Sequence, residues 1–448
     1  MKRKNVFCRL SGLAFTIVFL MLLMISGAFA ADLSRMEIPS TANPVGSGAR
    51  ALGMGGAFIA VADDATAASW NPGGLIQLEK PELSVVGSYV HLGENNTFGN
   101  NPEASGQQSV GYGNLNYLSG AYPFKALNRN MIVSLNYQHL YDFNRQWNFG
   151  CNFPGGFYTA PVSYDYEQKG ALYALGLAYS VEIVPSFSMG LTLNYWGDGL
   201  YNNKWEQTYK VHGNLNMGGF PGTTDLYQKE SFAFSGWNAN LGFLWKMNGK
   251  WTLGGVFKAP FKADITRERQ YNTDTVFPTF PAANTSTSTS NKYYENLKMP
   301  MSYGLGLAYR FSDNFSMAGD VYRTQWNDYV YENFQGVKTS PINGLSEGEA
   351  NIGATTQIHL GCEYLFIKEK FTVPVRAGVF YDPVPAQGSP DNVYGFALGT
   401  GIAYKRFIFD IAYQYRWGND LGRSTMAGAN FSQSIQEHTI SASAIIHF

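Results

Sequence analysis

Apolar side chains alternate with small or polar ones at a period of two in many separate stretches of this chain. In residues 301–311 the odd positions hold Met, Tyr, Leu, Leu, Tyr and Phe, whereas the even positions hold Ser, Gly, Gly, Ala and Arg. Residues 407–416, 171–181 and 187–195 repeat the pattern. Successive side chains of a β-strand point to opposite faces, so each stretch predicts a strand with one apolar face. The sequence therefore predicts an all-β protein.

The lengths of the connections between these strands distinguish a barrel from a sandwich. Short turns are predicted at residues 125–130, 182–186, 246–250, 312–314, 367–370 and 405–406. Long loops are predicted at residues 91–113, 144–168, 201–230, 268–296, 327–354, 383–393 and 417–434. Six turns and seven loops join fourteen strands. An even strand number with short turns on one side and long loops on the other predicts a transmembrane antiparallel β-barrel.

The start of the chain indicates export. Residues 1–30 combine basic residues, an apolar core and the small-x-small sequence Ala28-Phe29-Ala30, which is typical of a cleaved signal peptide. An uncleaved membrane anchor is the alternative for this segment. The sequence after it has no run of 18 apolar residues, which excludes a transmembrane helix there. Charged residues make up only 15% of the chain, against about 25% in soluble domains, which favours a barrel in lipid.

Composition and motifs give no sign of catalysis or of nucleic-acid binding. Removal of the four basic residues of the signal peptide changes the formal net charge from -1 to -1 - 4 = -5. Cys151 and Cys362 alone remain, which indicates neither a disulfide framework nor a metal site. The six histidines are scattered, and none stands in a recognisable nucleophile motif. We therefore expect no enzymatic activity, no cofactor, no metal and no nucleic-acid partner.

Residues 31–80 differ from the rest of the chain because they are rich in Gly and Ala and lack strand alternation. They carry the acidic pair Asp63-Asp64 and end with Asn71-Pro72-Gly73 before the first predicted strand. Such a segment cannot span lipid, but a barrel of this size is wide enough to hold it. We expect three parts: a signal peptide (1–30), a luminal hatch or plug (31–80) and a transmembrane barrel (81–448).

The run from Gly48 to Leu78 resembles the N-terminal hatch of the FadL/TodX-type outer-membrane transporters, as residues 300–326 and 375–382 resemble later parts of that family. The family's hatch usually ends in Asn-Pro-Ala, whereas this chain has Gly73 in the third place. The terminal Phe448 resembles the signal by which the barrel-assembly machinery recognises outer-membrane proteins. An aromatic residue at the membrane interface is the alternative for Phe448.

The resemblance implies a cell outer-membrane channel for passive uptake of long-chain fatty acids or other hydrophobic compounds. Ligands would be captured by extracellular loops, bound in the lumen and released sideways through the wall near the hatch. The aromatic candidates for capture are Trp205, Tyr209, Phe220, Phe277 and Phe280. Arg376 falls on the polar phase of its strand and is a candidate to bind a ligand carboxylate. The alternative is an ion pair with luminal Asp320 or Asp410, or with a hatch acid such as Asp63 or Asp64.

Two features leave the position of the wall opening and the function open. In the family the wall opening involves a kink in the third strand, yet residues 131–143 contain neither Gly nor Pro, the usual markers of a bulge. The Gly-rich start would also suit a barrel that acts as a binding or assembly partner for exported proteins, which is the alternative function. A water-filled porin and an outer-membrane hydrolase are weaker alternatives.

Overall fold

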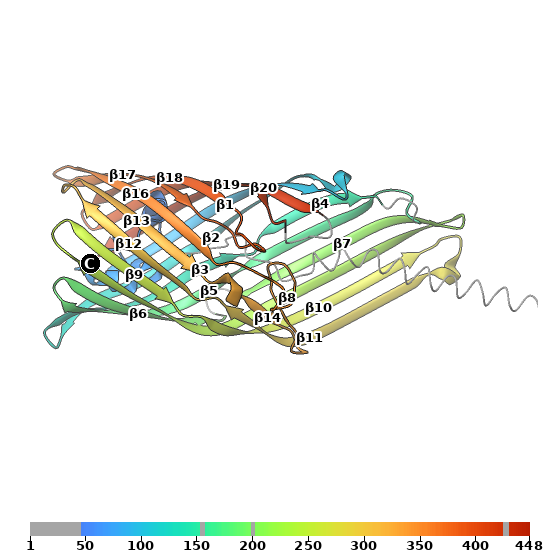
Figure 1. The fold of residues 1–448 in the computed structure, drawn as a ribbon, viewed down its shortest axis with the longest axis horizontal. Coiled ribbons are helices and arrows are strands. Elements are labelled where there is room, and N and C mark those ends of the chain that lie inside the picture. The colour runs from blue at the N-terminus through green and yellow to red at the C-terminus, as the bar shows by residue number, and fades with distance from the viewer. Residues whose placement is uncertain (1–45, 153–156, 199–201, 424–429) are drawn as a thin grey trace, which may run out of the picture.

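The computed structural model describes residues 46–152, 157–198, 202–423 and 430–448. The expected signal peptide and residues 31–45 of the expected hatch lie outside these ranges. Twenty antiparallel strands dominate these described ranges (Figure 1). The strands are β1 (Glu82–Phe98), β2 (Gly106–Ala126), β3 (Arg129–Asp142), β4 (Arg145–Cys151), β5 (Val162–Val184), β6 (Phe187–Trp196), β7 (Lys204–Met217), β8 (Phe220–Lys246), β9 (Trp251–Lys258), β10 (Phe261–Val276), β11 (Thr285–Met299), β12 (Ser302–Arg310), β13 (Phe315–Thr324), β14 (Val330–Glu332), β15 (Lys338–Thr339), β16 (Thr355–Ile367), β17 (Phe371–Tyr381), β18 (Val393–Tyr404), β19 (Phe407–Leu421) and β20 (Phe431–His447).

Helical structure in the described part of the chain is short. The helices are α2 (Ala49–Gly53), α3 (Ala67–Trp70) and the 3-10 turns η1 (Pro72–Gln77), η2 (Pro102–Ala104), η3 (Pro281–Ala283) and η4 (Trp326–Asp328). A helix of sufficient length and apolarity to cross a bilayer is not found among the described residues.

The wall of the barrel has fourteen strands, as the alternation predicts. Its order is β1, β2, β3, β5, β6, β8, β9, β12, β13, β16, β17, β18, β19 and β20. The last strand pairs with the first along β1, from Glu82 opposite His447 to Phe98 opposite Phe431. This pairing closes the sheet into a barrel, as a strand structure in lipid requires.

Four of the predicted long loops consist largely of strand, which corrects the expectation for residues 91–113, 144–168, 201–230 and 268–296. The strands β4, β7, β10 and β11, with the adjoining ends of β5 and β8, form one antiparallel sheet. This sheet, which we call the extension, projects well beyond the rest of the barrel (Figure 1). The side chains of Thr285 to Ser290 are polar on both faces, so the alternation that marks a strand is missing there.

The outer face of the wall suits a hydrocarbon environment. Leu83, Leu305 and Ile411, on three different strands, are each more than half exposed. Aromatic pairs border this apolar band, with Trp251 and Tyr309 near the short turns and Tyr195 and Trp237 on the side of the extension. An apolar band between two aromatic girdles is the outer surface of a membrane barrel.

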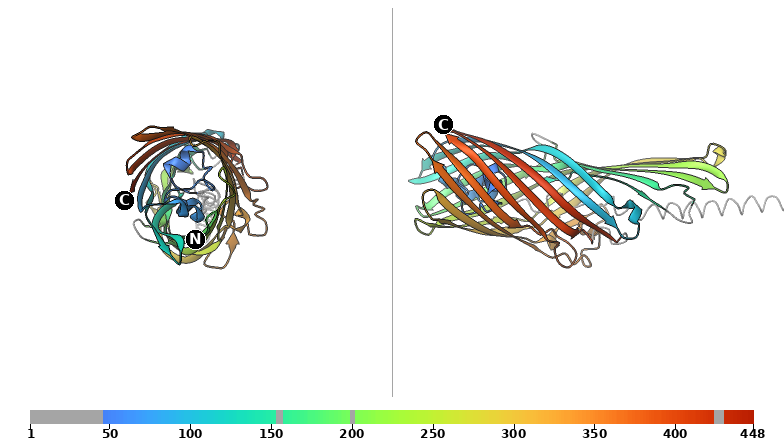
Figure 2. Two further views of the ribbon diagram at one scale, coloured as in Figure 1. Left: turned by 90° about the vertical axis from the view of Figure 1, so that its left-hand side faces the viewer. Right: turned by 90° about the horizontal axis from the view of Figure 1, so that it is seen from above.

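Residues 46–80, which we call the inner segment, lie inside the barrel. In the view along the barrel axis their helices occupy the middle of the ring of strands (Figure 2). The helices of this segment are short and its side chains are small, so it fits into the narrow lumen of the barrel. The buried cluster built on Phe58, Ile59 and Leu75 includes wall residues such as Ala178 and Val256, so the core lies between the inner segment and the wall.

Candidate functional site

Close contacts seat the inner segment on glycines of the wall. A Cβ atom on Gly254 of β9 would lie 2.5 Å from the carbonyl oxygen of Ile59 and 3.0 Å from the Cα atom of Ala60. A Cβ atom on Gly378 of β17 would lie 2.5 Å from the amide nitrogen of Gly55. Wall glycines in similarly close contact with the inner segment are Gly190, Gly242, Gly304, Gly306, Gly361 and Gly399. Backbone therefore lies against backbone around the lumen, which no larger residue would permit.

Hydrogen bonds from several wall strands hold the same segment. Asp320 of β13 is buried, and its Oδ2 accepts the backbone N–H groups of Phe58 at 2.6 Å and Ile59 at 2.8 Å. Further bonds run from the Ser188 hydroxyl to the carbonyl of Gly73 (2.8 Å), from the Thr192 hydroxyl to Ala68 (3.0 Å), from the Tyr117 hydroxyl to Ala65 (2.6 Å) and from the Ala65 N–H to Glu82 (2.8 Å). The segment is thus bound to strands on opposite sides of the barrel.

The sequence Asn71-Pro72-Gly73 fastens the inner segment to β8 and β6. The Asn71 amide donates to the carbonyls of Ile59 at 2.9 Å and Phe243 at 2.8 Å, and its Oδ1 accepts the N–H of Gly73 at 3.1 Å. Asn71 therefore caps η1 and joins two parts of the segment to the wall. The structure places this motif against β6 and β8, and the motif acts as a structural clamp there.

Arg376 lies in a buried ion-pair network. Its Nε is 2.5 Å from Glu363 Oε2, and its Nη1 is 2.6 Å from Asp410 Oδ1. Glu363 also pairs with Arg50 of the inner segment at 2.9 Å, and Arg50 pairs with Asp63. Charges in such a lumen require partners, and here the guanidinium bridges wall carboxylates. These contacts favour a structural role for Arg376 over ligand binding.

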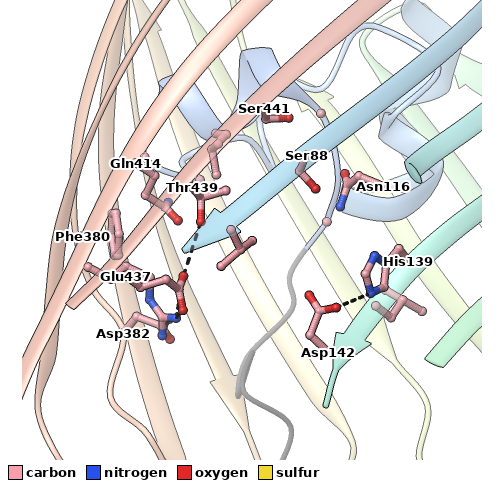
Figure 3. Close-up of a pocket in the computed structure, with 18 of the residues that line it drawn as sticks. Ser88, Asn116, His139, Asp142, Phe380, Asp382, Gln414, Glu437, Thr439 and Ser441 are labelled. Atoms are coloured by element: carbon pink, nitrogen blue, oxygen red, sulfur yellow. Dashed lines mark hydrogen bonds and ion pairs between the residues drawn. The ribbon is translucent and has the colours of Figure 1, made fainter. Parts of the chain in front are cut away.

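A cavity lined by polar and apolar side chains lies next to the inner segment (Figure 3). Asp382, Glu437 and Arg416 lie on one wall, where Arg416 pairs with Asp382 at 2.8 Å and with Glu437 at 3.1 Å. His139 and Asp142 of β3 lie on the opposite wall, 2.9 Å apart. We call this space the polar chamber; its other polar lining residues are Ser88, Tyr112, Asn114, Asn116, Gln357, His359, Gln414, Thr439 and Ser441.

A second cavity, the aromatic chamber, lies beside the first. Its apolar lining is Leu140, Tyr141, Trp196, Ala259, Phe261, Met299, Pro300 and Trp326, and its polar lining is Asn194, Asn238, Asn240, Lys258, Ser302, Tyr322 and Thr324. Leu140 lines both chambers. Several of the rings belong to a buried cluster that continues to Trp205, at the junction between barrel and extension. Lys258 lies two residues after Val256 and therefore on the inward phase of β9.

The wall is irregular where it borders the polar chamber. The β2–β3 ladder runs from Ala126 opposite Arg129 only as far as Tyr117 opposite Gln138, although β2 continues to Gly106. In the same region Leu140 is an extra residue in the pairing of β3 with β5. Further along β2, the side-chain amide of Gln108 donates to the carbonyl of Asn148 in β4, a strand of the extension, at 2.8 Å. The third strand thus has a bulge without the Gly or Pro that would have marked it.

The five aromatic candidates for capture lie at different heights of the extension. Trp205 is fully buried between Phe143 and Phe232, with ring centroids 4.5 and 4.9 Å apart. Tyr209 and Phe277 are buried higher up. Phe220 and Phe280 are 44% and 42% exposed and lie 5.3 Å apart near the tips of two hairpins. Two of the five therefore present rings to the solvent, and three form interior packing.

The geometry defines a transmembrane β-barrel whose lumen is occupied by an N-terminal segment and contains two chambers. No three His, Cys, Asp or Glu side chains gather to hold a metal in the part of the chain that the structure describes. The model of the family "Outer membrane protein transport protein (OMPP1/FadL/TodX)" matches residues 40–446, and the chain belongs to this family of outer-membrane transport proteins. No curated protein matches the chain.

Solved structures of the same fold cover nearly the whole chain. A Pseudomonas aeruginosa FadL homologue is 13% identical, with a TM-score of 0.61 over 93% of this chain and 100% of that one. The P. putida toluene transporter TodX is 14% identical, with a TM-score of 0.59 over 91% and 99%. The CymD monoaromatic hydrocarbon channel is 16% identical, with a TM-score of 0.52 over 91% and 98%. These identities are low, so the likeness concerns the fold.

Proposed function

We propose that this protein takes up hydrophobic small molecules across the outer membrane by passive diffusion, with release sideways through the wall between β2 and β3. The family consists of outer-membrane transport proteins, and two of the similar structures are of a toluene transporter and a monoaromatic hydrocarbon channel. Long-chain fatty acids and hydrocarbons are both within the proposed range. The route has three stages, which are capture, luminal binding and lateral release.

Exposed rings support capture at the extension. Phe220 and Phe280 offer apolar surface to the solvent. From there the buried stack around Trp205 leads towards the aromatic chamber. Burial of each CH2 group contributes about 0.8 kcal/mol, so a ligand gains free energy as it moves from water into these apolar surroundings.

The observation that carries lateral release is the interrupted β2–β3 ladder beside the polar chamber. Wall strands on all sides hold the inner segment, so a straight passage along the barrel axis would require many bonds to break together. By contrast, the β2–β3 ladder ends at Tyr117, and the bulge at Leu140 lies next to that point. A ligand in the chamber therefore has its shortest way out through this interruption.

Deletion of Leu140 tests the route. Removal of the extra residue restores a regular pairing of β3, so the wall should close beside the chamber. We expect uptake of a labelled hydrophobic probe into intact cells to fall at least tenfold, while binding to the purified barrel is retained. Deletion of Ile183, the extra residue in the β5–β6 pairing near a short turn, is the matched control because it removes a bulge far from the chamber.

The two deletions separate the possible outcomes. Loss of uptake in the Leu140 deletion alone supports lateral release at β2–β3. Uptake that is unchanged in a correctly inserted Leu140 deletion excludes this exit. A protein that neither binds nor takes up toluene or a fatty acid in its unaltered form would not be the proposed channel at all.

A further inference from the structure

The short turns of the barrel carry a surplus of positive charge. The six turns, at residues 125–130, 182–186, 246–250, 312–314, 367–370 and 405–406, lie at the end of the barrel away from the extension (Figure 1). Their basic residues, which we call the basic rim, are Lys125, Arg129, Lys246, Lys250, Lys368, Lys370, Lys405 and Arg406. Their three acidic residues are Glu182, Asp313 and Glu369, so the formal charge of the six turns is 8 - 3 = +5. A quarter of the chain's 32 lysines and arginines thus lies in these few residues.

The opposite end of the barrel has the opposite charge. The seven long connections at residues 91–113, 144–168, 201–230, 268–296, 327–354, 383–393 and 417–434 contain eight basic and sixteen acidic residues. Their formal charge is therefore 8 - 16 = -8. A surface that attracts anions is thus confined to the end with the short turns, which in outer-membrane barrels is the periplasmic end.

The protein itself does not neutralise the basic rim. All eight of its residues are exposed. In the part of the chain that the structure describes, none of them forms an ion pair with a carboxylate. The nearby acidic groups have other partners, since Asp313 pairs with Arg310 at 2.7 Å and Glu182 accepts a hydrogen bond from the Asn130 amide at 2.7 Å. The counterions of the rim must therefore come from its surroundings.

Contacts with aromatic rings place the rim at the border of the hydrocarbon layer. The Nζ of Lys250 lies 6.0 Å from the centre of the Tyr309 ring, and the Nζ of Lys405 lies 5.1 Å from that of Tyr404. The guanidinium carbon of Arg406 lies 5.2 Å from the centre of the Phe407 ring. Aromatic girdles of membrane proteins lie at the level of the lipid headgroups. The cations of the rim therefore lie where phosphate groups of lipids are found.

The rim also surrounds the barrel. Its cations occupy the β2–β3, β8–β9, β16–β17 and β18–β19 turns, which are distributed around the closed order of the wall. A bound protein of ordinary size would contact one side of this ring, whereas a lipid leaflet surrounds all of it. The distribution of the cations thus favours lipid headgroups over an acidic protein.

We propose that the basic rim binds the headgroups of anionic phospholipids in the periplasmic leaflet of the outer membrane. The ammonium and guanidinium groups donate hydrogen bonds to the phosphate oxygens. The acyl chains of the same lipids pack against the apolar band above the rim. This interaction surface goes beyond the proposed uptake, and it depends on neither the substrate nor its route.

A comparison of phosphatidylglycerol with phosphatidylethanolamine tests the rim, because lipids with the same acyl chains then differ in net charge. The full-length mature barrel is delipidated in a non-ionic detergent and incubated with equal amounts of both lipids. Native mass spectrometry measures the ratio of the two lipids that remain bound. One basic side chain near an anionic membrane surface contributes a factor of about five in affinity. We therefore expect a bound ratio of at least fivefold in favour of phosphatidylglycerol.

Two variants with equal changes in charge locate the preference. The rim variant combines Lys246→Gln, Lys250→Gln, Lys368→Gln and Lys370→Gln, which lowers the charge of the six turns to 5 - 4 = +1. The control variant combines Lys204→Gln, Lys210→Gln, Lys229→Gln and Lys292→Gln, which removes four positive charges from the extension. The bound ratio should fall at least fivefold in the rim variant and stay unchanged in the control. Heat-modifiable gel migration checks that both barrels are folded.

A measurement on the unaltered protein does not depend on how any variant folds. Its preference for phosphatidylglycerol should weaken when ammonium acetate is raised from about 0.1 M to about 1 M, because salt screens exposed charges. A preference that is insensitive to salt would contradict an attraction to exposed cations.

The other outcomes are equally decisive. Equal retention of the two lipids by the unaltered protein overturns the inference and leaves an acidic protein as the partner of the rim. A preference that survives in the folded rim variant overturns it because other groups must then hold the headgroup. An equal loss in both variants overturns it because the total charge, and not the rim, is then responsible. Failure of the unaltered protein to bind toluene or a fatty acid would overturn the proposed function alone.

Discussion

Replacement of Asp320 by alanine tests how firmly the inner segment is held. The Asp320 Oδ2 accepts two backbone N–H groups, from Phe58 at 2.6 Å and from Ile59 at 2.8 Å, and the side chain is 2% exposed. Alanine leaves both buried donors without an acceptor, at a cost of about 1–3 kcal/mol each. The lower limit, about 2 kcal/mol in total, raises the population of a locally detached segment about 30-fold.

Hydrogen exchange followed by mass spectrometry measures this population directly. We expect peptides from residues 46–62 to exchange about 30-fold faster in Asp320→Ala, while peptides from β1 and β20 keep their protection. The control is Asp313→Ala, in the turn before β13, where the carboxylate is 85% exposed and pairs only with Arg310 among its described contacts. Equal exchange of residues 46–62 in the unaltered protein and in Asp320→Ala would refute the anchoring role.

Two further predictions concern the seat of the inner segment and the capture of ligands. Gly254→Val should displace the segment because a Cβ atom there would lie 2.5 Å from Ile59 O; ion conductance in planar bilayers should rise, and Gly249→Val, with open space at its Cβ, should not change it. Phe220→Ser combined with Phe280→Ser should slow ligand association severalfold in stopped-flow fluorescence with little effect on dissociation, and an unchanged association rate would contradict capture at these rings.

Alternation predicted the fourteen-stranded wall because the two faces of each wall strand meet different surroundings. On β19, Phe409 and Ile411 face outwards and are each 52% exposed, whereas Asp410 and Ala412 are buried on the inner side. Lipid requires apolar side chains, and a plugged lumen accepts small or polar ones. The sequence therefore alternates between apolar and small or polar residues along each wall strand.

The extension was predicted as loops because that contrast ends where the lipid ends. In β11, Thr287 and Ser288 are both exposed although they lie on opposite faces of the strand. A sheet with water on both sides needs no apolar face, so period-two patterning disappears while backbone pairing continues. Only the register with β10, set by contacts distant in sequence, shows that these residues form strands.

The site was predictable only in part. The inward phase of Lys258 can be read from β9, but its place beside Asn240 and Ser302 depends on the register of three strands. The bulge at Leu140 leaves no mark in the sequence, because Leu140 is not among the residues with positive φ and needs no glycine. Arg376 could be placed inside, but its pairing could not be fixed, since Glu363 lies on the neighbouring strand β16 and Asp410 lies on β19, two strands away.

The part of β8 that extends beyond the membrane determines how far from the bilayer a solute can first contact this protein. On the outside of β8 the apolar band ends at Trp237, and the strand begins at Phe220, 237 - 220 = 17 residues away. At about 3.3 Å per residue and a tilt of about 40°, the tip stands roughly 40 Å above the hydrocarbon. If the exposed rings capture ligands, a sparingly soluble compound meets them in the aqueous phase before it can dissolve in the outer leaflet. Diffusion through water to the tip would then set the supply of ligand, and partitioning into the bilayer would compete with capture.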